Sequence, residues 1–109
     1  YGFLIIFIIS IIKETAGAPE ISSIKANKRK VSLRWKKVSN ATGYYVYRST
    51  NPKTSFKKVK TVTGGQTSYT EKKALSKNKT YYYKIVAFDK SGSKITKSNA
   101  SKAKKIFVK

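Results

Sequence analysis

The chain has 109 residues, enough for one domain with a modest hydrophobic core. It contains no cysteine and no histidine, so disulfides, thiolate nucleophiles, imidazole bases and the usual zinc ligands are excluded. Its 25 Lys and Arg residues stand against 4 Asp and Glu residues, and the formal net charge of +21 favours anionic partners and disfavours self-association.

The few acidic residues argue against catalysis. A hydrolase site built on carboxylates needs two of them close together, but the four acids are spread along the chain: Glu14, Glu20, Glu71 and Asp89. We therefore expect no catalytic residue, no metal site and no cofactor. Most of the cations are lysines, which are poorly suited to the bidentate hydrogen bonds that read DNA bases. The composition favours diffuse attraction to polyanions over specific nucleic-acid recognition.

An apolar run at residues 3–12 opens the chain and is too short to span a bilayer, which takes about 20 residues. The polar residues that follow end in Ala16-Gly17-Ala18, which fits the small-x-small pattern of a signal-peptide cleavage site. Three interpretations stay open for residues 1–18: a truncated signal peptide, the remnant of a membrane anchor, or an artefact or upstream tail. The first two imply export, which suits a cysteine-free surface protein of a Gram-positive bacterium. We expect the folded domain to span residues 19–109.

From Pro19 onward, short apolar and polar alternations are broken by turn residues at intervals of about 8 to 12 positions, which predicts an all-β sandwich or barrel. Ile21 and Ile24 mark a first strand. Residues 30–38 predict a half-buried strand, because alternate apolar side chains share one face: Val31, Leu33 and Trp35.

The middle of the chain predicts further short elements. A third strand begins at Gly43 and ends before Asn51-Pro52. Residues 56–62 predict a fourth strand whose apolar residues break strict alternation, which indicates an edge strand with a bulge. Its lysines would prevent the exposed edge from pairing with another strand. After these come a Gly64-Gly65 turn, a short strand at 67–70 and a longer crossing loop at 71–79.

Residues 80–89, TYYYKIVAFD, predict a strand with two different faces. One face carries Tyr81, Tyr83, Ile85 and Ala87, and the other carries Tyr82, Lys84, Val86 and Phe88. Residues 89–92 predict a hairpin turn, from which the chain returns through Ile95 to a last strand that ends at 106–108. Seven short strands result.

These elements resemble a fibronectin type III domain over essentially all of residues 19–109. Three features carry the resemblance: the Pro-led opening strand with Val31-x-Leu33-x-Trp35, the segment Gly43–Arg48, and the run from Leu75 through Tyr81, Tyr83, Ile85 and Ala87. The second is similar to the third strand of versions found in bacterial surface and secreted proteins. The resemblance implies an all-β, seven-stranded antiparallel Ig-like sandwich, here preceded by the short apolar N-terminal segment.

The resemblance also implies roles for buried residues. Tyr81 matches the tyrosine corner, whose ring is buried and whose hydroxyl bonds to backbone, here in the loop at 75–79. Lys77 and Asn78 stand where many members have Pro-Gly, and Asn can adopt the left-handed conformation that Gly supplies. The expected structural core consists of Trp35, Leu33, Val31, Leu75, Tyr81, Tyr83 and Ile85.

The other face of residues 80–89 is a candidate binding face, because the neighbouring third strand turns further tyrosines to the same side. Its expected members are Tyr45, Tyr47, Tyr82, Lys84 and Phe88. One interpretation is that these side chains cover one another as cross-strand pairs on a solvated sheet. In another, the rings stack on sugars or on a partner module while lysines hold anionic groups. A buried contact between domains is the third.

The lysines recur on nearly every predicted strand and turn, so the positive field is distributed and not focused in one groove. We expect a non-catalytic, monomeric module of an exported bacterial protein, located outside the cell or at its surface, that acts as a spacer and as a cationic adhesion or cell-wall-association unit. Its expected partners are anionic cell-wall polymers or polysaccharide and the neighbouring domains of a longer chain. Two alternatives are a carbohydrate-binding accessory domain of a secreted polysaccharide-degrading enzyme and a non-specific polyanion binder.

Overall fold

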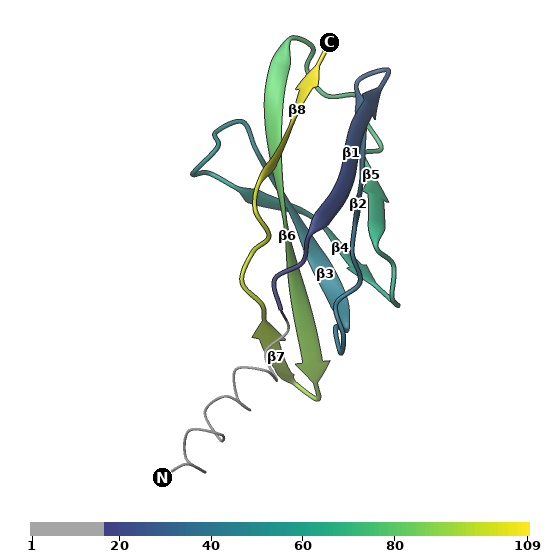
Figure 1. Cartoon of the computed structure of the whole chain (residues 1–109), viewed down its shortest axis with the longest axis vertical. Helices are drawn as coiled ribbons and strands as arrows, with labels where there is room; N and C mark the ends of the chain where they lie inside the picture. Colours follow the sequence, from purple (N-terminus) through teal and green to yellow (C-terminus); the bar gives the residue numbers. More distant parts are fainter. Residues whose placement is uncertain (1–16) are drawn as a thin grey trace.

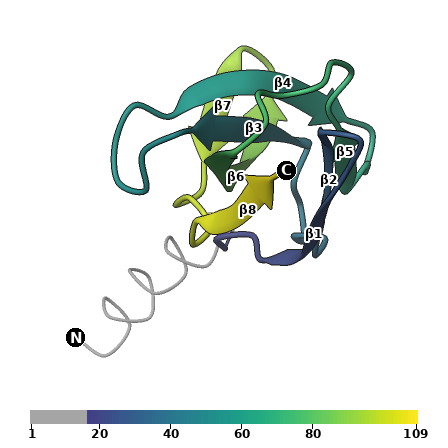
Figure 2. The same cartoon turned by 90° about the horizontal axis from the view of Figure 1, so that it is seen from above.

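The computed structural model describes residues 17–109, in which eight strands form two antiparallel sheets (Figure 1). The first sheet has the order β1-β2-β5, with β1 (Ile21–Asn27), β2 (Lys30–Trp35) and β5 (Ser68–Thr70). The second has the order β4-β3-β6-β7, with β8 also paired to β6: β4 (Lys57–Thr63), β3 (Gly43–Ser49), β6 (Lys79–Ser91), β7 (Lys94–Lys97) and β8 (Lys104–Val108). The two sheets face each other in the view from above (Figure 2). The expected all-β sandwich is confirmed.

The described chain enters the sandwich at Pro19, whose side chain is buried. Directly after it, the backbone N–H of Lys36 donates to the carbonyl oxygen of Glu20 at 2.9 Å. The interpretations of residues 1–18 as a signal peptide or an anchor depend on the apolar run, which lies outside the described residues. Within residues 17–109 the structure contains no helix long and apolar enough to cross a membrane.

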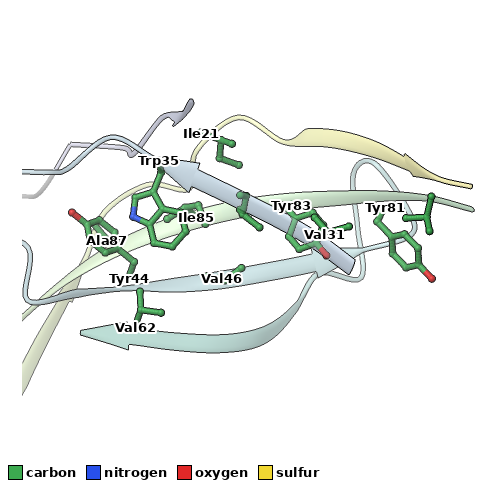
Figure 3. Packing of buried hydrophobic residues seen from close by; sticks show 12 residues of the cluster. Ile21, Val31, Trp35, Tyr44, Val46, Val62, Tyr81, Tyr83, Ile85 and Ala87 are labelled. Carbon is green, nitrogen blue, oxygen red and sulfur yellow. The ribbon is translucent and has the colours of Figure 1, made fainter. Parts of the chain in front are cut away.

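The core lies between the two sheets, where alternate side chains of facing strands meet (Figure 3). Trp35 of β2 meets the ring of Tyr44 of β3 edge-on, with centroids 5.4 Å apart and an interplanar angle of 61°. The hydroxyl of Tyr44 accepts a hydrogen bond of 2.8 Å from the backbone N–H of Val38. Six of the seven expected core residues are buried here, and Leu75 is half-buried and packs against the same cluster.

The tyrosine corner has the geometry that the resemblance implied. The ring of Tyr81 is buried, and its hydroxyl accepts a hydrogen bond of 3.1 Å from the backbone N–H of Ser76. Asn78 adopts a positive φ of 63°, the left-handed conformation expected where other members have glycine. This loop therefore turns without a glycine.

The fourth strand is an edge strand with a bulge, as its broken alternation predicted. β4 pairs with β3 and lies at the end of the described sheet. Val46 pairs with Lys60 and Tyr47 with Lys58, so Val59 is the extra residue on β4. The bulge lets both Val59 and Val62 contact the core although they are three positions apart.

The last part of the chain differs from the expectation in two details. β6 continues through Ser91, because residues 89–91 pair with β7, so the tight turn lies at Gly92 and the expected turn at 89–92 began three residues too early. The expected last strand is divided into β7 and β8, which accounts for eight strands where seven were expected. Between them, buried Ser98 and Ser101 use their Oγ atoms to accept hydrogen bonds of 2.9 Å from the backbone N–H groups of Ala87 and Ile85.

Candidate functional site

The predicted binding face lies on the outer side of the second sheet, where its central rings pack against one another. Tyr45 and Phe88 stack with ring centroids 4.5 Å apart and an interplanar angle of 19°, and Tyr47 meets Tyr45 edge-on at 6.5 Å. With Val86 they form an apolar cluster separate from the core. Tyr45 is 7% exposed and Phe88 is 4% exposed. Neither ring offers an open surface on which a sugar could stack.

Lysine side chains from neighbouring strands cover the ring of Tyr45. The Nζ atoms of Lys58 and Lys97 lie 4.4 and 5.5 Å from the ring centroid of Tyr45. On the same face, the Nζ atom of Lys84 lies 4.5 Å from the ring centroid of Phe56. Each such cation–π contact contributes about 0.5 to 1 kcal/mol at an exposed site. This geometry favours the interpretation of mutual covering, and it leaves Tyr47 and Tyr82 as the half-buried rings of the face.

The packing of Phe88 depends on a glycine in the neighbouring strand. Gly43 of β3 is paired directly with Phe88 of β6. A Cβ atom at Gly43 would lie 2.8 Å from Cζ of Phe88 and would also collide with the carbonyl oxygen of Val62. The missing side chain therefore allows the Phe88 ring to lie against the backbone of β3.

A second site is built around Glu71, to which the sequence analysis assigned no role. Glu71 directly follows β5, and the residue is only 6% exposed. Arg48 of β3 forms an ion pair with Oε2, and the hydroxyl of Tyr83 of β6 donates to the same oxygen at 2.6 Å. The hydroxyl of Tyr69 of β5 donates to Oε1 at 2.9 Å. Both sheets thus contribute to this group of four side chains, which we call the Glu71 cluster.

The Glu71 cluster keeps its tyrosines protonated. Burial, followed by the hydrogen bond to Glu71, raises the pKa of Tyr69 to about 12. The same two causes raise the pKa of Tyr83 further above its ordinary value. Burial lowers the pKa of Arg48, but the hydrogen bond and the attraction of Glu71 outweigh this effect and raise it overall. Near neutral pH both hydroxyls therefore donate to the carboxylate, and the arginine stays charged.

A hollow of about 450 Å³ lies beside the Glu71 cluster and involves most of its members. Its remaining lining is of two kinds: the half-buried apolar side chains of Val59 and Leu75, and three exposed lysines. Lys60 comes from β4 beside the bulge, and Lys72 and Lys73 lie near the start of the loop at 71–78 between β5 and β6. We call this space the basic hollow.

The sequence contained an indication of the Glu71 cluster. Glu71 is one of four acids in a chain with 25 cations, and it lies two positions after Tyr69, so both side chains share one face of an extended segment. Neither this spacing nor the two-residue period of the strands indicated which cation would pair with Glu71.

Within residues 17–109, no group of three or more His, Cys, Asp and Glu side chains could hold a metal ion.

Comparison with known proteins gives structural matches. No family model matches the chain, and no curated protein sequence matches it significantly. A β-1,2-glucanase from Parabacteroides distasonis is 26% identical over 85% of this chain, with a TM-score of 0.72, and the match covers 13% of that enzyme. The pectate lyase Pel3 from Pectobacterium carotovorum is 20% identical over 77% of this chain, with a TM-score of 0.60, and 26% of its length is covered. The chain therefore spans a small part of each enzyme.

A smaller protein matches over most of its own length. An Fn3-like protein from Clostridium thermocellum is 22% identical, with a TM-score of 0.57, and the match covers 80% of this chain and 86% of that one. The two-sheet strand order, the buried Trp35 and the corner formed by Tyr81 agree with this likeness. The chain has the fibronectin type III fold.

Proposed function

We propose that this chain is a non-catalytic module of an exported bacterial protein, in which it serves as a spacer and associates with anionic polymers of the cell wall. The observation that carries this proposal is the large number of lysines without an acidic partner. Among residues 17–109, Lys36 is the only lysine in a salt bridge, with Glu20 at 3.4 Å. Lys13 and Glu14 cancel, so residues 17–109 carry the whole net charge of +21.

The positions of the lysines support loose attraction through many contacts. In the described part of the chain every lysine except Lys84 is exposed, and six of the eight strands carry at least one lysine: β1, β2, β4, β6, β7 and β8. An exposed lysine is a compact hydrated charge on a flexible stem, which attracts a polyanion without fixing its orientation. Association with a charged polymer then releases counterions and weakens as salt is added.

The wall-association proposal is tested by titrating the chain onto purified Gram-positive cell walls, with and without their teichoic acids, at about 0.15 M salt. We expect binding to intact walls that falls when the teichoic acids are removed. Double-stranded DNA serves as the control polyanion. If walls and DNA bind equally and added salt weakens both to the same extent, the chain has no selectivity for the wall and acts only as a charged spacer. No binding to walls would refute the proposal.

A second candidate function is that of an accessory module in a polysaccharide-degrading enzyme. The matches to parts of a β-1,2-glucanase and a pectate lyase favour it. In this case the half-buried rings of Tyr47 and Tyr82 would contact the sugar, since Tyr45 and Phe88 are covered.

This second candidate predicts that Tyr47→Ser with Tyr82→Ser abolishes binding to a neutral β-1,2-glucan. Tyr47→Phe with Tyr82→Phe is the matched control, because it keeps both rings. Absence of glucan binding by the unchanged chain, or equal binding by the Ser and Phe variants, would rule out these rings as a sugar platform.

A further inference from the structure

We propose that the basic hollow binds a negatively charged sugar residue of a polysaccharide. This inference rests on the proposed function, because it names the place at which an anionic polymer is held and the kind of residue that the polymer carries. It assigns a role to side chains that are absent from the predicted binding face.

The charge of the basic hollow comes from its three lysines. Arg48 and Glu71 neutralise each other in their ion pair, so together they add nothing to the net charge around the hollow. Lys60, Lys72 and Lys73 are exposed, and no acidic side chain of the described residues forms a salt bridge with them. They surround one space from two separate segments, β4 and the loop at 71–78. Their mutual repulsion is relieved when an anionic group enters.

The other lining residues suit a sugar ring better than a bare ion. Val59 and Leu75 are half-buried apolar side chains, and Tyr69 adds an aromatic ring whose hydroxyl is held by Glu71. Such surfaces pack against the C–H faces of a pyranose while the lysines attract its charged group. The volume of about 450 Å³ lies within the range of about 300 to 1,000 Å³ that is usual for ligand sites.

The Glu71 cluster makes the wall of the hollow rigid before any ligand arrives. Hydrogen bonds from Tyr69 and Tyr83 and the ion pair with Arg48 satisfy the carboxylate from both sheets. Because the guanidinium of Arg48 is bound to Glu71, the lysines are the cations available to bind the ligand. Lysine attracts charge without the planar, two-pronged geometry of arginine. The ligand class is therefore a sugar carrying a carboxylate or a phosphate group.

The test compares two triple variants of the full chain that lose the same charge. The hollow variant is Lys60→Gln/Lys72→Gln/Lys73→Gln, and the control variant, at exposed positions outside the hollow, is Lys90→Gln/Lys94→Gln/Lys105→Gln. Calorimetric titration with trigalacturonate supplies the carboxylate arm, mannose 6-phosphate the phosphate arm and maltotriose the neutral arm. Circular dichroism before titration establishes that all three proteins are folded.

We expect the hollow variant to bind the preferred anionic sugar about tenfold more weakly than the unchanged chain, which corresponds to about 1.4 kcal/mol, with a much smaller loss in the control variant. Preference for trigalacturonate or for mannose 6-phosphate supports the proposal and identifies the charged group. Equal losses in both variants overturn the hollow as a site and leave diffuse binding intact. Failure of the unchanged chain to bind either anionic sugar, or equal binding of maltotriose, overturns this inference and leaves the proposed function standing if the walls still bind. Failure to bind the walls overturns the proposed function.

Discussion

Tyr83 of β6 donates its hydroxyl hydrogen to Oε2 of Glu71 at 2.6 Å, and this buried bond joins the two sheets of the sandwich. The carboxylate at its centre is also held by Arg48 and Tyr69. A buried ion pair adds little net stability over a well-packed apolar replacement, but removal of one partner leaves an uncompensated charge. The Glu71 cluster is therefore a place where single substitutions should have large effects.

Glu71→Gln should lower the free energy of unfolding by about 3 kcal/mol or more. The substitution keeps the size of the side chain but leaves the guanidinium of Arg48, which is 29% exposed, without its counter-charge. Urea unfolding of the unchanged chain and the variant measures the loss.

Two further variants show whether the loss comes from the buried pair. Arg48→Met combined with Glu71→Gln should recover part of the stability, because no charge is left unpaired. Lys36→Gln breaks the ion pair with Glu20, whose partners are 66% and 67% exposed, and should change stability little. A loss in Glu71→Gln no larger than in Lys36→Gln would contradict the role given to the cluster.

The contribution of Tyr69 should depend on pH in the alkaline range. Its pKa is raised from the ordinary value of 10.0 to about 12, so the folded chain holds this proton more tightly than the unfolded chain. The stability that comes from the tighter proton binding at the Tyr69 hydroxyl is fully present below about pH 10 and is lost as pH rises toward about 12. The difference in unfolding free energy between the unchanged chain and Tyr69→Phe should therefore narrow over this interval, because the other titrating groups are common to both proteins. A constant or widening difference would refute this linkage.

Tyr81→Phe should cost about 1 to 3 kcal/mol, because it leaves the backbone N–H of Ser76 without the hydroxyl that now accepts its hydrogen bond at 3.1 Å. Thermal and urea unfolding both measure this effect. Tyr82→Phe on the half-buried outer face is the matched control and should change stability little. Equal melting temperatures for the two variants would count against the tyrosine corner as a stabilising element.

Gly43→Ala should destabilise the fold by about 1 to 3 kcal/mol through overpacking. The added Cβ meets Cζ of Phe88 at 2.8 Å and the carbonyl oxygen of Val62. Phe88→Leu in the same chain should restore part of the loss, because it removes one of the two collisions. Gly17→Ala is the control, since its Cβ meets nothing within 4 Å. If Gly43→Ala unfolds at the same urea concentration as Gly17→Ala, Gly43 has no steric role.

The melting temperature should rise with added salt, because the chain carries a net charge of +21 on one small domain. At physiological ionic strength, repulsion between exposed charges is screened beyond about 8 Å. Melting curves between about 0.02 and about 0.5 M sodium chloride test this, in the range over which screening changes most. The Lys90→Gln/Lys94→Gln/Lys105→Gln variant should show a smaller rise. A flat or falling curve for the unchanged chain would show that repulsion does not limit its stability.

Features that depend on near neighbours could be predicted from the sequence. Val31, Leu33 and Trp35 face the core because successive side chains of a strand alternate, whichever sheet covers them. The corner of Tyr81 and the left-handed Asn78 lie within a few residues of each other. The spacing of Val59 and Val62 indicated the bulge in β4 for the same reason, since an extra residue shifts the alternation of its own strand.

The same alternation placed Tyr45 and Phe88 on the outer face but could not show that they are covered. The exposure of Tyr45 depends on Lys58 and Lys97, which reach it from β4 and β7, and that of Phe88 depends on the ring of Tyr45, which stacks on it. The direction of a side chain follows from its own strand, whereas its exposure depends on the side chains of other strands. Tyr47 and Tyr82 are therefore the more accessible rings of the predicted face.

The absence of cysteine and histidine chemistry, the high positive charge and the order of inward and outward residues along each strand follow directly from the amino-acid sequence. The burial of Glu71 and the choice of the side chains that neutralise it depend on how the two sheets pack. Its partners Tyr69, Tyr83 and Arg48 lie 2, 12 and 23 positions away, and two of them belong to the opposite sheet. They meet because the two sheets pack face to face, and a buried carboxylate is stable there only when it is paired and hydrogen-bonded.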